Sequence, residues 1–482
     1  MFLLLAPWQL EYREGAVLFQ VKGLLAGVPV YSPGQLPVYL NVYGTVYNSL
    51  AAILGQVFGV SFFLLRAISF VSIALSLVVF NDILRRRGAA ALIRLALCFY
   101  LYLALLYATT PLARPDAMGF LVMLLCFWCY VVWPESLWSM LAITMLSLMG
   151  LLIKQYFAMA GPLLISHTFF FRSHRRGVAW AAFFFCALAA AWTVHGYFYP
   201  GYLPLALAST SGKASPLDLH STLYMLKQST HFLRLFLGAV LLCWVYSDRS
   251  PQIWRQRLRL SCWPVYCACL MLLLLEGKLG HHDGAYLTYY LQLLAPFLLL
   301  AVAPSANENV RPMRFAAAVL AVVLLLTAAQ TWKTVRSPFL TARAGREFAA
   351  AAEDLSARHS VLGSPILVGI LLAQNKPVYY SGQSMDLIAV ANKKALHLPG
   401  LKPSPEQCAA IDAAYQAKIL NMIMARQFDL VVTDDDDSLA PRQKEAIRAY
   451  YTLARVRNIN GVAENEWEAK DAAIDRNPQE TR

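Results

Sequence analysis

The chain has 482 residues, of which 58% are hydrophobic and only 14% are charged. Soluble globular proteins contain about 45–50% apolar and about 25% charged residues, so this composition excludes an ordinary soluble enzyme, a disordered chain and a small disulfide-rich domain. The net charge of +13 is unevenly placed: residues 1–332 carry 22 Lys and Arg against 10 Asp and Glu, whereas residues 333–482 carry 19 against 18. We therefore expect a basic, polytopic α-helical membrane domain over residues 1–332 and a near-neutral, charge-rich domain over residues 333–482.

Apolar runs that approach the length of a membrane span follow one another through the first domain. A helix needs roughly 20 apolar residues to cross the hydrocarbon core. Residues 1–10 reach half that length, which leaves two interpretations: a first span that begins before this sequence, or a short terminal segment. Residues 41–59 are apolar but rich in Tyr, Asn and Gln, and we expect an interfacial helix there, within a first outward loop of residues 11–64. Ten spans are expected, or eleven with the first, at residues 65–83, 91–109, 117–133, 138–153, 156–171, 178–196, 232–247, 261–277, 286–304 and 314–332.

The arginines predict the orientation of these spans. Basic residues in short loops are enriched on the cytoplasmic side of a membrane. The expected cytoplasmic loops hold Arg85, Arg86, Arg87, Arg94, Arg172, Arg175, Arg176, Arg249, Arg255, Arg257, Arg259, Arg311 and Arg314. The alternate loops and everything after Trp332 then face outward, so the sequence predicts a multi-pass membrane protein with an extracytoplasmic C-terminal domain; the resemblance described below implies that the membrane is the inner (plasma) membrane and that this domain is periplasmic.

The C-terminal domain has the pattern of a small α/β unit. Alternation of helices and short apolar strands is typical of a parallel sheet. Residues 464–482 are polar and are expected to be a frayed end. The expected elements are helices at residues 341–359 and 411–427 and strands at residues 365–369, 376–380 and 428–433.

Few ionisable residues fall on the outward side of the predicted membrane domain, and such residues near a membrane are usually functional. A carboxylate can take a proton from an acceptor hydroxyl, and Lys and Arg can hold a phosphate. Each residue also has a simpler alternative: Glu14 ends a helix, Asp116 caps one beside Arg114, and Lys154 reaches toward the headgroups. The outward set is Glu11, Glu14, Asp116, Lys154, Gln155, His281, His282, Asp283, Tyr286 and Tyr289.

The order of these residues resembles the GT-C superfamily of polytopic glycosyltransferases, in particular the bacterial branch similar to dolichyl-phosphate-mannose–protein mannosyltransferases and to lipid A aminoarabinose transferase. Such proteins open with a helix, an acidic residue and a glycine, followed by a tyrosine-containing outward loop and an interfacial helix. An arginine at the next span, an Ala-Arg-x-Asp loop and a Lys-Gln pair follow, and many members end in an outward soluble domain. The matching positions are Glu14-Gly15, residues 43–47, Phe58-Gly59, Arg66, residues 113–116, Lys154-Gln155, residues 284–290 and residues 428–431.

The resemblance implies transfer of a sugar from a polyprenyl-phosphate carrier to a glycan, lipid or protein acceptor outside the membrane. It implies a catalytic carboxylate in the first outward loop, which is Glu14 by position with Glu11 as the rival, and a second acid, Asp116. Arg114 and Lys154 are expected to meet the donor phosphate. No essential metal or cofactor is implied. The other substrate-binding candidates are Gln155, Tyr43, His282, Tyr286 and Tyr289.

Two other functions compete with sugar transfer. A transporter or flippase of lipid-linked sugars would place charges and broken helices near the bilayer midplane. Here the acids fall at the predicted ends of helices, which favours the transferase. An inactive relative that acts as a scaffold through its C-terminal domain is the third hypothesis, and the sequence leaves the sugar and the acceptor open.

Overall fold

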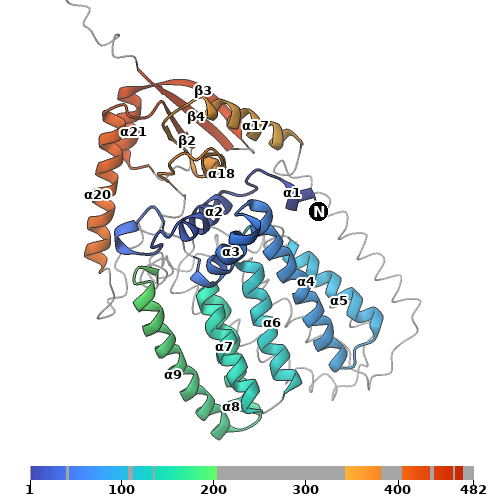
Figure 1. Ribbon diagram of the computed structural model, residues 1–482. Coiled ribbons are helices and arrows are strands. Elements are labelled where there is room, and N and C mark those ends of the chain that lie inside the picture. The colour runs from blue at the N-terminus through green and yellow to red at the C-terminus, as the bar shows by residue number, and fades with distance from the viewer. Residues whose placement is uncertain are drawn as a thin grey trace, which may run out of the picture.

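A computed structural model describes residues 2–39, 43–106, 112–133, 136–202, 342–380, 404–434, 439–459 and 462–470. It has a bundle of long helices at one end, an α/β domain at the other, and a layer of short helices between them (Figure 1). The four predicted spans between residues 232 and 332 and the expected boundary after residue 332 lie outside the described residues.

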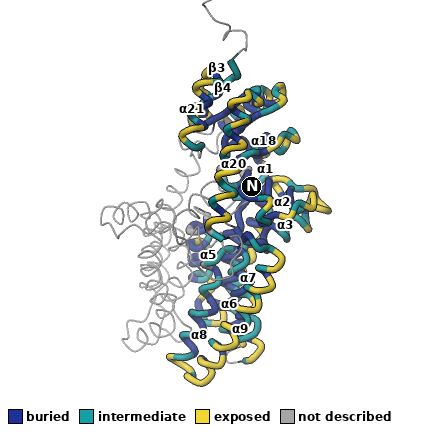
Figure 2. The backbone as a smooth tube through the Cα atoms, turned by 90° about the vertical axis from the view of Figure 1, so that its left-hand side faces the viewer, coloured by how far each residue is buried: buried dark blue, intermediate teal, exposed yellow. Residues whose placement is uncertain are grey.

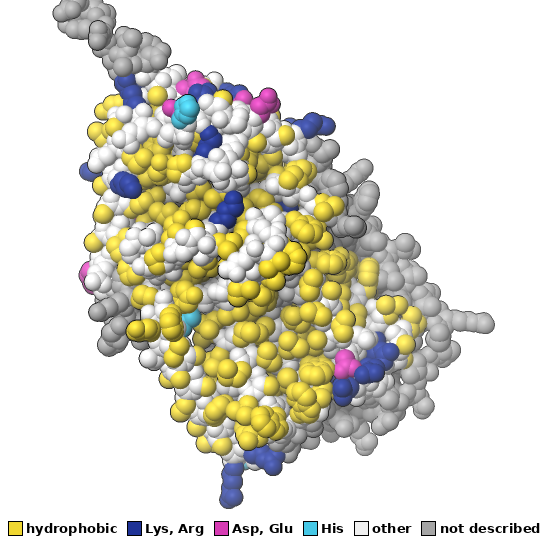
Figure 3. All heavy atoms as spheres, in the orientation of Figure 1, with side chains coloured by type: hydrophobic (Ala, Val, Ile, Leu, Met, Phe, Trp, Pro, Cys, Tyr) yellow, Lys and Arg dark blue, Asp and Glu magenta, His cyan; other side chains and the backbone are white. Residues whose placement is uncertain are grey.

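The first six predicted spans each coincide with helices of the structure. Two of these helices, α4 and α9, are long and apolar enough to cross a membrane, and the other apolar helices are shorter. Their surface is dominated by apolar side chains, whereas charged side chains gather at the far end of the bundle and on the α/β domain (Figure 3). The helices are α4 (Phe62–Arg86), α5 (Ala91–Leu106), α6 (Asp116–Val132), α7 (Leu137–Ile153), α8 (Ala160–Phe171), which follows the 3₁₀ turn η2 (Gln155–Met159), and α9 (His174–Phe198).

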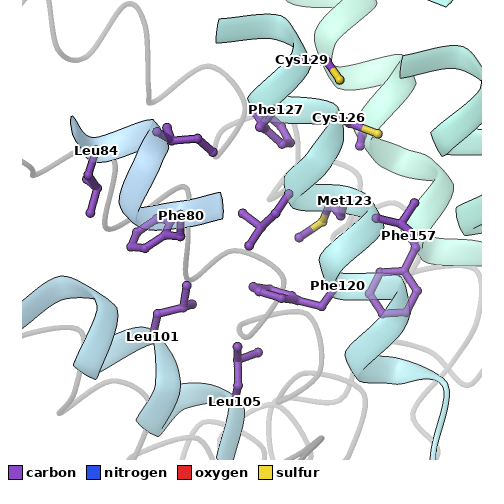
Figure 4. Close-up of a cluster of buried hydrophobic side chains, with 14 of the residues drawn as sticks. Phe80, Leu84, Leu101, Leu105, Phe120, Met123, Cys126, Phe127, Cys129 and Phe157 are labelled. Atoms are coloured by element: carbon purple, nitrogen blue, oxygen red, sulfur yellow. The ribbon is translucent and has the colours of Figure 1, made fainter. Parts of the chain in front are cut away.

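The core of the bundle is apolar and aromatic. Phe80 and Leu101 meet Phe120 and Phe127 between α4, α5 and α6, and Phe157 closes the cluster from the η2 turn (Figure 4). Gly119 permits this closure, because a β-carbon at that position would lie 2.1 Å from the ring of Phe157. The tight contact holds the outer end of α6 against the turn that follows α7.

Short helices form a layer over the outer ends of the bundle: α1 (Phe2–Leu5), α2 (Tyr12–Leu25), η1 (Pro33–Gln35) and α3 (Thr45–Phe58). The sequence analysis predicted α3 as an interfacial helix but did not predict α2. One face of α3 contacts α2, α4 and α7, while Ile53, Val57 and Phe58 on its other side are exposed. An exposed apolar face on a helix at the ends of membrane helices is typical of an interfacial position.

The C-terminal domain contains a mixed four-stranded sheet with the strand order β1-β2-β4-β3. Strands β1 and β2 are parallel, whereas β4 is antiparallel to both β2 and β3. The elements are α17 (Ala342–Ser356), β1 (Val361–Leu362), η5 (Pro365–Leu367), α18 (Val368–Ala373), α20 (Pro405–Met424), β2 (Leu430–Asp434), α21 (Pro441–Tyr450), β3 (Tyr451–Ile459) and β4 (Val462–Ala469).

Four sequence predictions for this domain are wrong. Residues 365–369 are helical rather than extended, because Ser364 and Pro365 begin a helical turn that continues into α18. Residues 376–380 form no strand, and the sheet is not all parallel, because β3 and β4 form an antiparallel hairpin. Residues 464–469 belong to β4 instead of a frayed end, since the buried carboxylate of Glu466 pairs with Arg455 and Arg457 of β3.

The C-terminal domain packs directly on α2. Phe19 of α2 lies in the same hydrophobic cluster as Val368 and Leu371 of α18. Gln9, just before α2, accepts a hydrogen bond from the backbone N–H of Gly369 at 3.2 Å, and the Nζ of Lys22 donates to a carbonyl at the end of α18 at 3.1 Å. Figures 1 and 2 both place α18 directly over α2. The domain and the first outward loop thus share one core.

Candidate functional site

Glu14 lies in the first turn of α2 and is completely buried. Its Oε1 accepts hydrogen bonds from Arg66 Nε at 3.0 Å and from the backbone N–H of Ala113 at 2.7 Å. Its Oε2 accepts from Arg66 Nη2 and from the backbone N–H of Leu10, both at 2.7 Å. A carboxylate has about four acceptor positions, and protein groups occupy all of them here. Glu14 therefore ties α2 to α4 and to the loop before α6.

Glu11 caps the same helix and has a different environment. Its Oε2 accepts from the backbone N–H of Arg13 at 3.1 Å, and its Oε1 lies 3.8 Å from Arg13 Nε. About a fifth of its side chain (22%) is exposed. Burial raises the pKa of the Glu11 carboxyl above its usual value, and the nearby cations of Arg114 and Arg13 act in the opposite direction. Glu11 is thus a partly accessible carboxyl beside two guanidinium groups.

Asp116, at the first position of α6, joins two cations. Its Oδ1 lies 2.7 Å from Lys154 Nζ, and its Oδ2 lies 3.3 Å from Arg114 Nε. The carboxylate is buried, and Arg114 and Lys154 are nearly so. Ser69 of α4 donates a hydrogen bond to the backbone carbonyl of Arg114 at 3.0 Å, which fixes the loop that carries both charges. Arg114 and Asp116 follow α5, and Lys154 follows α7. Together these three residues form one charge cluster.

Tyr43 covers this cluster. Its ring centroid lies 5.0 Å from Lys154 Nζ and 5.9 Å from Arg114 Cζ, within the range of cation–π contact. The position depends on the next residue: the N–H of Gly44 donates to the carbonyl of Ile153 at 2.9 Å, and a β-carbon on Gly44 would lie 1.8 Å from the carbonyl oxygen of Leu152. Only glycine allows the loop before α3 to lie this close to the end of α7.

The cluster lowers the pKa of Lys154, which lies just past the end of α7. Burial is the largest cause, Arg114 and Arg13 act in the same direction, and the Asp116 carboxylate opposes them, with a resulting pKa of about 8. Burial also raises the pKa of Tyr43. Arg13, Arg114 and Lys154 carry three positive charges against the two carboxyls of Glu11 and Asp116. An ionised cluster of this kind has a net positive charge and attracts an anion.

Sequence reasoning missed Arg13 as a site residue, although it stands between Glu11 and Glu14. It also missed a buried polar network that supports Tyr43. Tyr31 donates to the backbone carbonyl of Tyr43 at 2.5 Å, and Asn48 donates to both Gln20 and Tyr31. Tyr and Asn recur through residues 31–48 of the sequence, but this pattern does not indicate which of them form hydrogen bonds with one another.

The remaining predicted residues divide into two groups. Gln155 follows Lys154 in the η2 turn, and its Nε2 is buried without a hydrogen-bond partner among the described residues. His282, Tyr286 and Tyr289 lie outside the described residues, so their predicted roles stay predictions. Within the described part of the chain, no group of three or more His, Cys, Asp or Glu is placed to hold a metal.

The site gathers at one end of the helix bundle. Glu11 precedes α2, Asp116 begins α6 and Lys154 follows α7, so these groups lie at helix ends beneath α3 and the C-terminal domain (Figure 1). The arginines that end α4 and begin α9 lie at the opposite end. The positively charged cluster covered by Tyr43 can hold a phosphate. The neighbouring carboxyl of Glu11 can accept a proton a short distance away.

Solved structures share this arrangement of elements. The crystal structure of ArnT from Cupriavidus metallidurans in the apo state superposes with a TM-score of 0.52 at 12% identity, covering 96% of this chain and 95% of that one. The same enzyme bound to undecaprenyl phosphate gives a TM-score of 0.50 at 11% identity with the same coverage. The chain thus shares the fold of ArnT. No family model and no curated relative matches the sequence. This likeness supports the polytopic membrane character of the expected fold class, and two of the helices in the described residues are long and apolar enough to cross a membrane.

Proposed function

We propose that this protein is a glycosyltransferase that moves a sugar from a polyprenyl-phosphate-linked donor to an acceptor on the outer face of the inner membrane. The observation that carries the proposal is the cluster of Arg114, Asp116 and Lys154 beside Glu11, at the outer ends of the helices of a GT-C fold. The structural neighbour ArnT is a GT-C aminoarabinose transferase with a structure bound to undecaprenyl phosphate. A lipid carrier would reach the cluster from the bilayer, and a polar acceptor would arrive from water.

In the proposed reaction Glu11 acts as the general base. Its carboxylate takes the proton of an acceptor hydroxyl, the acceptor oxygen attacks the anomeric carbon, and the bond from that carbon to the phosphate oxygen breaks. The polyprenyl phosphate leaves with the bonding electron pair, and Lys154, Arg114 and Arg13 stabilise its negative charge. Asp116 holds two of these cations at 2.7 and 3.3 Å, and Tyr43 limits their access to water.

Glu11 fits the base better than Glu14, although the sequence position favoured Glu14. A general base needs an oxygen that can reach the acceptor proton. The oxygens of Glu14 accept four hydrogen bonds within the protein, and its side chain is fully buried. The side chain of Glu11 is partly exposed, and it lies close enough to Arg114 for the guanidinium to act on its pKa. We assign Glu14 to positioning: it fixes the first turn of α2, from which Glu11 and Arg13 extend.

Transport of a lipid-linked sugar is the second candidate function. A transporter usually binds its substrate near the bilayer midplane between broken helices. Asp116 and Lys154 instead lie at the first position of α6 and just past the end of α7, and α4, α6 and α7 run without a break. This placement supports transfer at the membrane surface over passage through it.

The proposal is tested by comparing cells with and without the gene. Mass spectrometry of their glycolipids, envelope glycans and glycoproteins is expected to reveal one glycan that lacks a sugar in the deletion strain. The wild-type chain and Glu353→Gln, an exposed carboxylate of α17, should restore the sugar, while Glu11→Gln should not. An unchanged glycan profile in the deletion strain would overturn the transferase. Restoration by Glu11→Gln would overturn the base assignment alone.

A further inference from the structure

Tyr43, Gly44 and Thr45 form a short strap that carries the ring above the charge cluster. One attachment of this strap is to the end of α7, where the N–H of Gly44 donates to the carbonyl of Ile153 at 2.9 Å. A single hydrogen bond fixes one point of a backbone and leaves the peptide groups on either side of it to be held by other contacts. The strap has two further attachments, and both lead to the outer end of α9.

The first of these joins Thr45 to His195. The Oγ1 of Thr45, the first residue of α3, lies 3.0 Å from the Nε2 of His195 in the last turn of α9, and both side chains are buried. A hydroxyl can donate or accept, so this hydrogen bond forms with either neutral form of the imidazole. The imidazole ring packs against the rings of Tyr199 and Tyr202, each with a centroid 5.1 Å away. The start of α3 is thus bound to a side chain that its neighbours hold in place.

The second attachment is made by Tyr31, which donates from its hydroxyl to the backbone carbonyl of Tyr43 at 2.5 Å. Tyr31 has a φ of 65°, a left-handed conformation that a bulky side chain rarely adopts. The N–H of Gly201, shortly after α9, donates to the Tyr31 carbonyl at 2.9 Å, and the ring of Tyr202 meets the Tyr31 ring edge-on at 5.1 Å. Strained backbone persists only where the surroundings fix it, and it is concentrated at functional sites. Here the strained residue directs its hydroxyl at the strap.

The position of the strap matters because the ring of Tyr43 covers two cations. Its centroid lies 5.0 Å from Lys154 Nζ and 5.9 Å from Arg114 Cζ. Charges attract one another more strongly where water is excluded. A displaced ring would admit water to both cations and weaken their attraction for a phosphate. The contact between Thr45 and His195 can therefore act on the cations through Tyr43.

We propose that His195 and Tyr31 are positioning residues for the carrier phosphate, because they hold the strap from the outer end of α9 and so keep the ring of Tyr43 above Lys154. This inference rests on the proposed function, in which the phosphate belongs to a polyprenyl carrier. Both residues act through Tyr43 and not by contact with the phosphate. Helix α9 thereby takes part in carrier binding from a position outside the charge cluster.

Variants that keep the shape of each side chain test the attachments, with undecaprenyl phosphate binding to the purified full-length chain measured by microscale thermophoresis in detergent. Thr45→Val removes the hydroxyl, His195→Phe removes Nε2 but keeps a ring, and Tyr31→Phe removes the donor to the strap. Each should weaken binding about 3- to 10-fold, the range for one neutral hydrogen bond. Thr45→Ser, which keeps the hydroxyl, should bind like the wild type. The matched control is Thr193→Val, since Thr193 is an exposed residue of α9 whose hydroxyl donates to the carbonyl of Ala189.

Two further readouts separate positioning from a merely structural role. In a Tyr43→Ala background, Thr45→Val should cause no additional loss of binding, because the ring through which it acts is already gone. The pH profile should also move. Burial is the largest cause of the lowered pKa of Lys154, where Arg114 and Arg13 act in the same direction and Asp116 opposes them. A less covered Lys154 keeps its proton to higher pH, so the fall in affinity should occur at higher pH in Thr45→Val.

The outcomes distinguish this inference from the proposed function. A wild-type chain that does not bind undecaprenyl phosphate would overturn both. Wild-type binding that Thr45→Val, His195→Phe and Tyr31→Phe leave undiminished would overturn the inference alone. Additive losses from Thr45→Val and Tyr43→Ala, with a lower melting temperature and an unshifted pH profile, would show general destabilisation and would also overturn it. Thr45→Val and His195→Phe remove the same bond from opposite sides, so either one is sufficient if the other does not fold.

Discussion

The carboxylate of Glu14 and the guanidinium of Arg66 meet at 2.7 and 3.0 Å, and neither side chain is exposed to solvent. Arg66 also donates to the backbone carbonyls of Ala6 and Trp8 at 2.5 and 2.7 Å. Two segments that are distant in sequence are thus joined through one buried pair. Breaking a buried pair by removal of one partner costs about 3–5 kcal/mol, because the other charge stays buried without compensation.

This pairing predicts a strong coupling between the two positions. Glu14→Met alone should lower the thermal stability of the detergent-solubilised protein sharply, because Arg66 keeps its charge. The double variant Glu14→Met/Arg66→Met should recover much of the loss, since apolar residues of similar volume replace the pair. Thermal unfolding of both variants measures the coupling. If the single and double variants lose the same thermal stability, Glu14 and Arg66 are not energetically coupled.

Glu11 is expected to behave in the opposite way. Glu11→Gln should leave the melting temperature and the binding of undecaprenyl phosphate close to those of the wild type, because its carboxyl is partly exposed and caps the helix through one oxygen. Sugar transfer should fall by about 10²–10⁴, the usual contribution of a general base. Quantitative glycan analysis of complemented cells measures the transfer. A variant that transfers sugar normally would exclude Glu11 as the base.

Lys154 is expected to determine affinity for the carrier phosphate. Lys154→Met should weaken the binding of undecaprenyl phosphate by about 10- to 100-fold, the loss expected for one hydrogen bond to a charged group. Lys154→Arg should retain most of the affinity because it keeps the charge beside Asp116. Microscale thermophoresis in detergent gives the dissociation constants. Arg343→Met, a surface arginine of α17, is the control and should bind normally.

The charge cluster also predicts how carrier binding depends on pH. Lys154 has a pKa of about 8, lowered by burial and by Arg114 and Arg13, so it loses its proton as the pH rises through that value. The affinity for undecaprenyl phosphate should therefore fall between pH 7 and pH 9. In Lys154→Arg the fall should disappear, because a guanidinium stays protonated throughout this range. A wild-type affinity that stays constant across this range would contradict the role of Lys154.

Gly44 offers a test of the loop that carries Tyr43. Gly44→Ala should weaken carrier binding, because a β-carbon 1.8 Å from the carbonyl oxygen of Leu152 displaces the loop and with it the ring above Lys154. Gly34→Ala is the matched control, since a β-carbon added at that position would have no atom within 4 Å. Comparable binding by both variants would show that Tyr43 does not depend on this contact.

The sequence predicted the first six helices of the bundle well because their signal is local. Six apolar runs became helices within a few residues of the expected bounds, and the run at residues 41–59, apolar but rich in Tyr, Asn and Gln, contains the helix α3. The grouping of Glu11, Asp116 and Lys154 at one end of the helix bundle was also predictable, since the ends of alternate spans meet on the same side. The sequence did not show which of the two acids, Glu11 or Glu14, is buried, because the burial of Glu14 depends on Arg66, 52 positions away.

The C-terminal domain shows the limit of pattern reasoning. The segment at residues 365–369 has the composition of a strand, but Pro365 begins a turn and the segment packs as a helix on α2. Strand β4 has the composition of a tail, because its buried residues include Glu464 and Glu466 instead of aliphatic ones. Arginines on β3 compensate Glu466, and that pairing is visible only once the hairpin has formed.

The contact between α18 and α2 makes the stability of α2 depend on the folding of the C-terminal domain. Phe19 shares a hydrophobic cluster with Val368 and Leu371 of α18, and the carbonyl of Leu372 near the end of α18 accepts a hydrogen bond from Lys22. Loss of the C-terminal domain would expose this side of α2 to water and loosen the helix from which Glu11 and Arg13 extend. The carboxyl at the proposed reaction centre is therefore held in place only after α18 has folded onto α2.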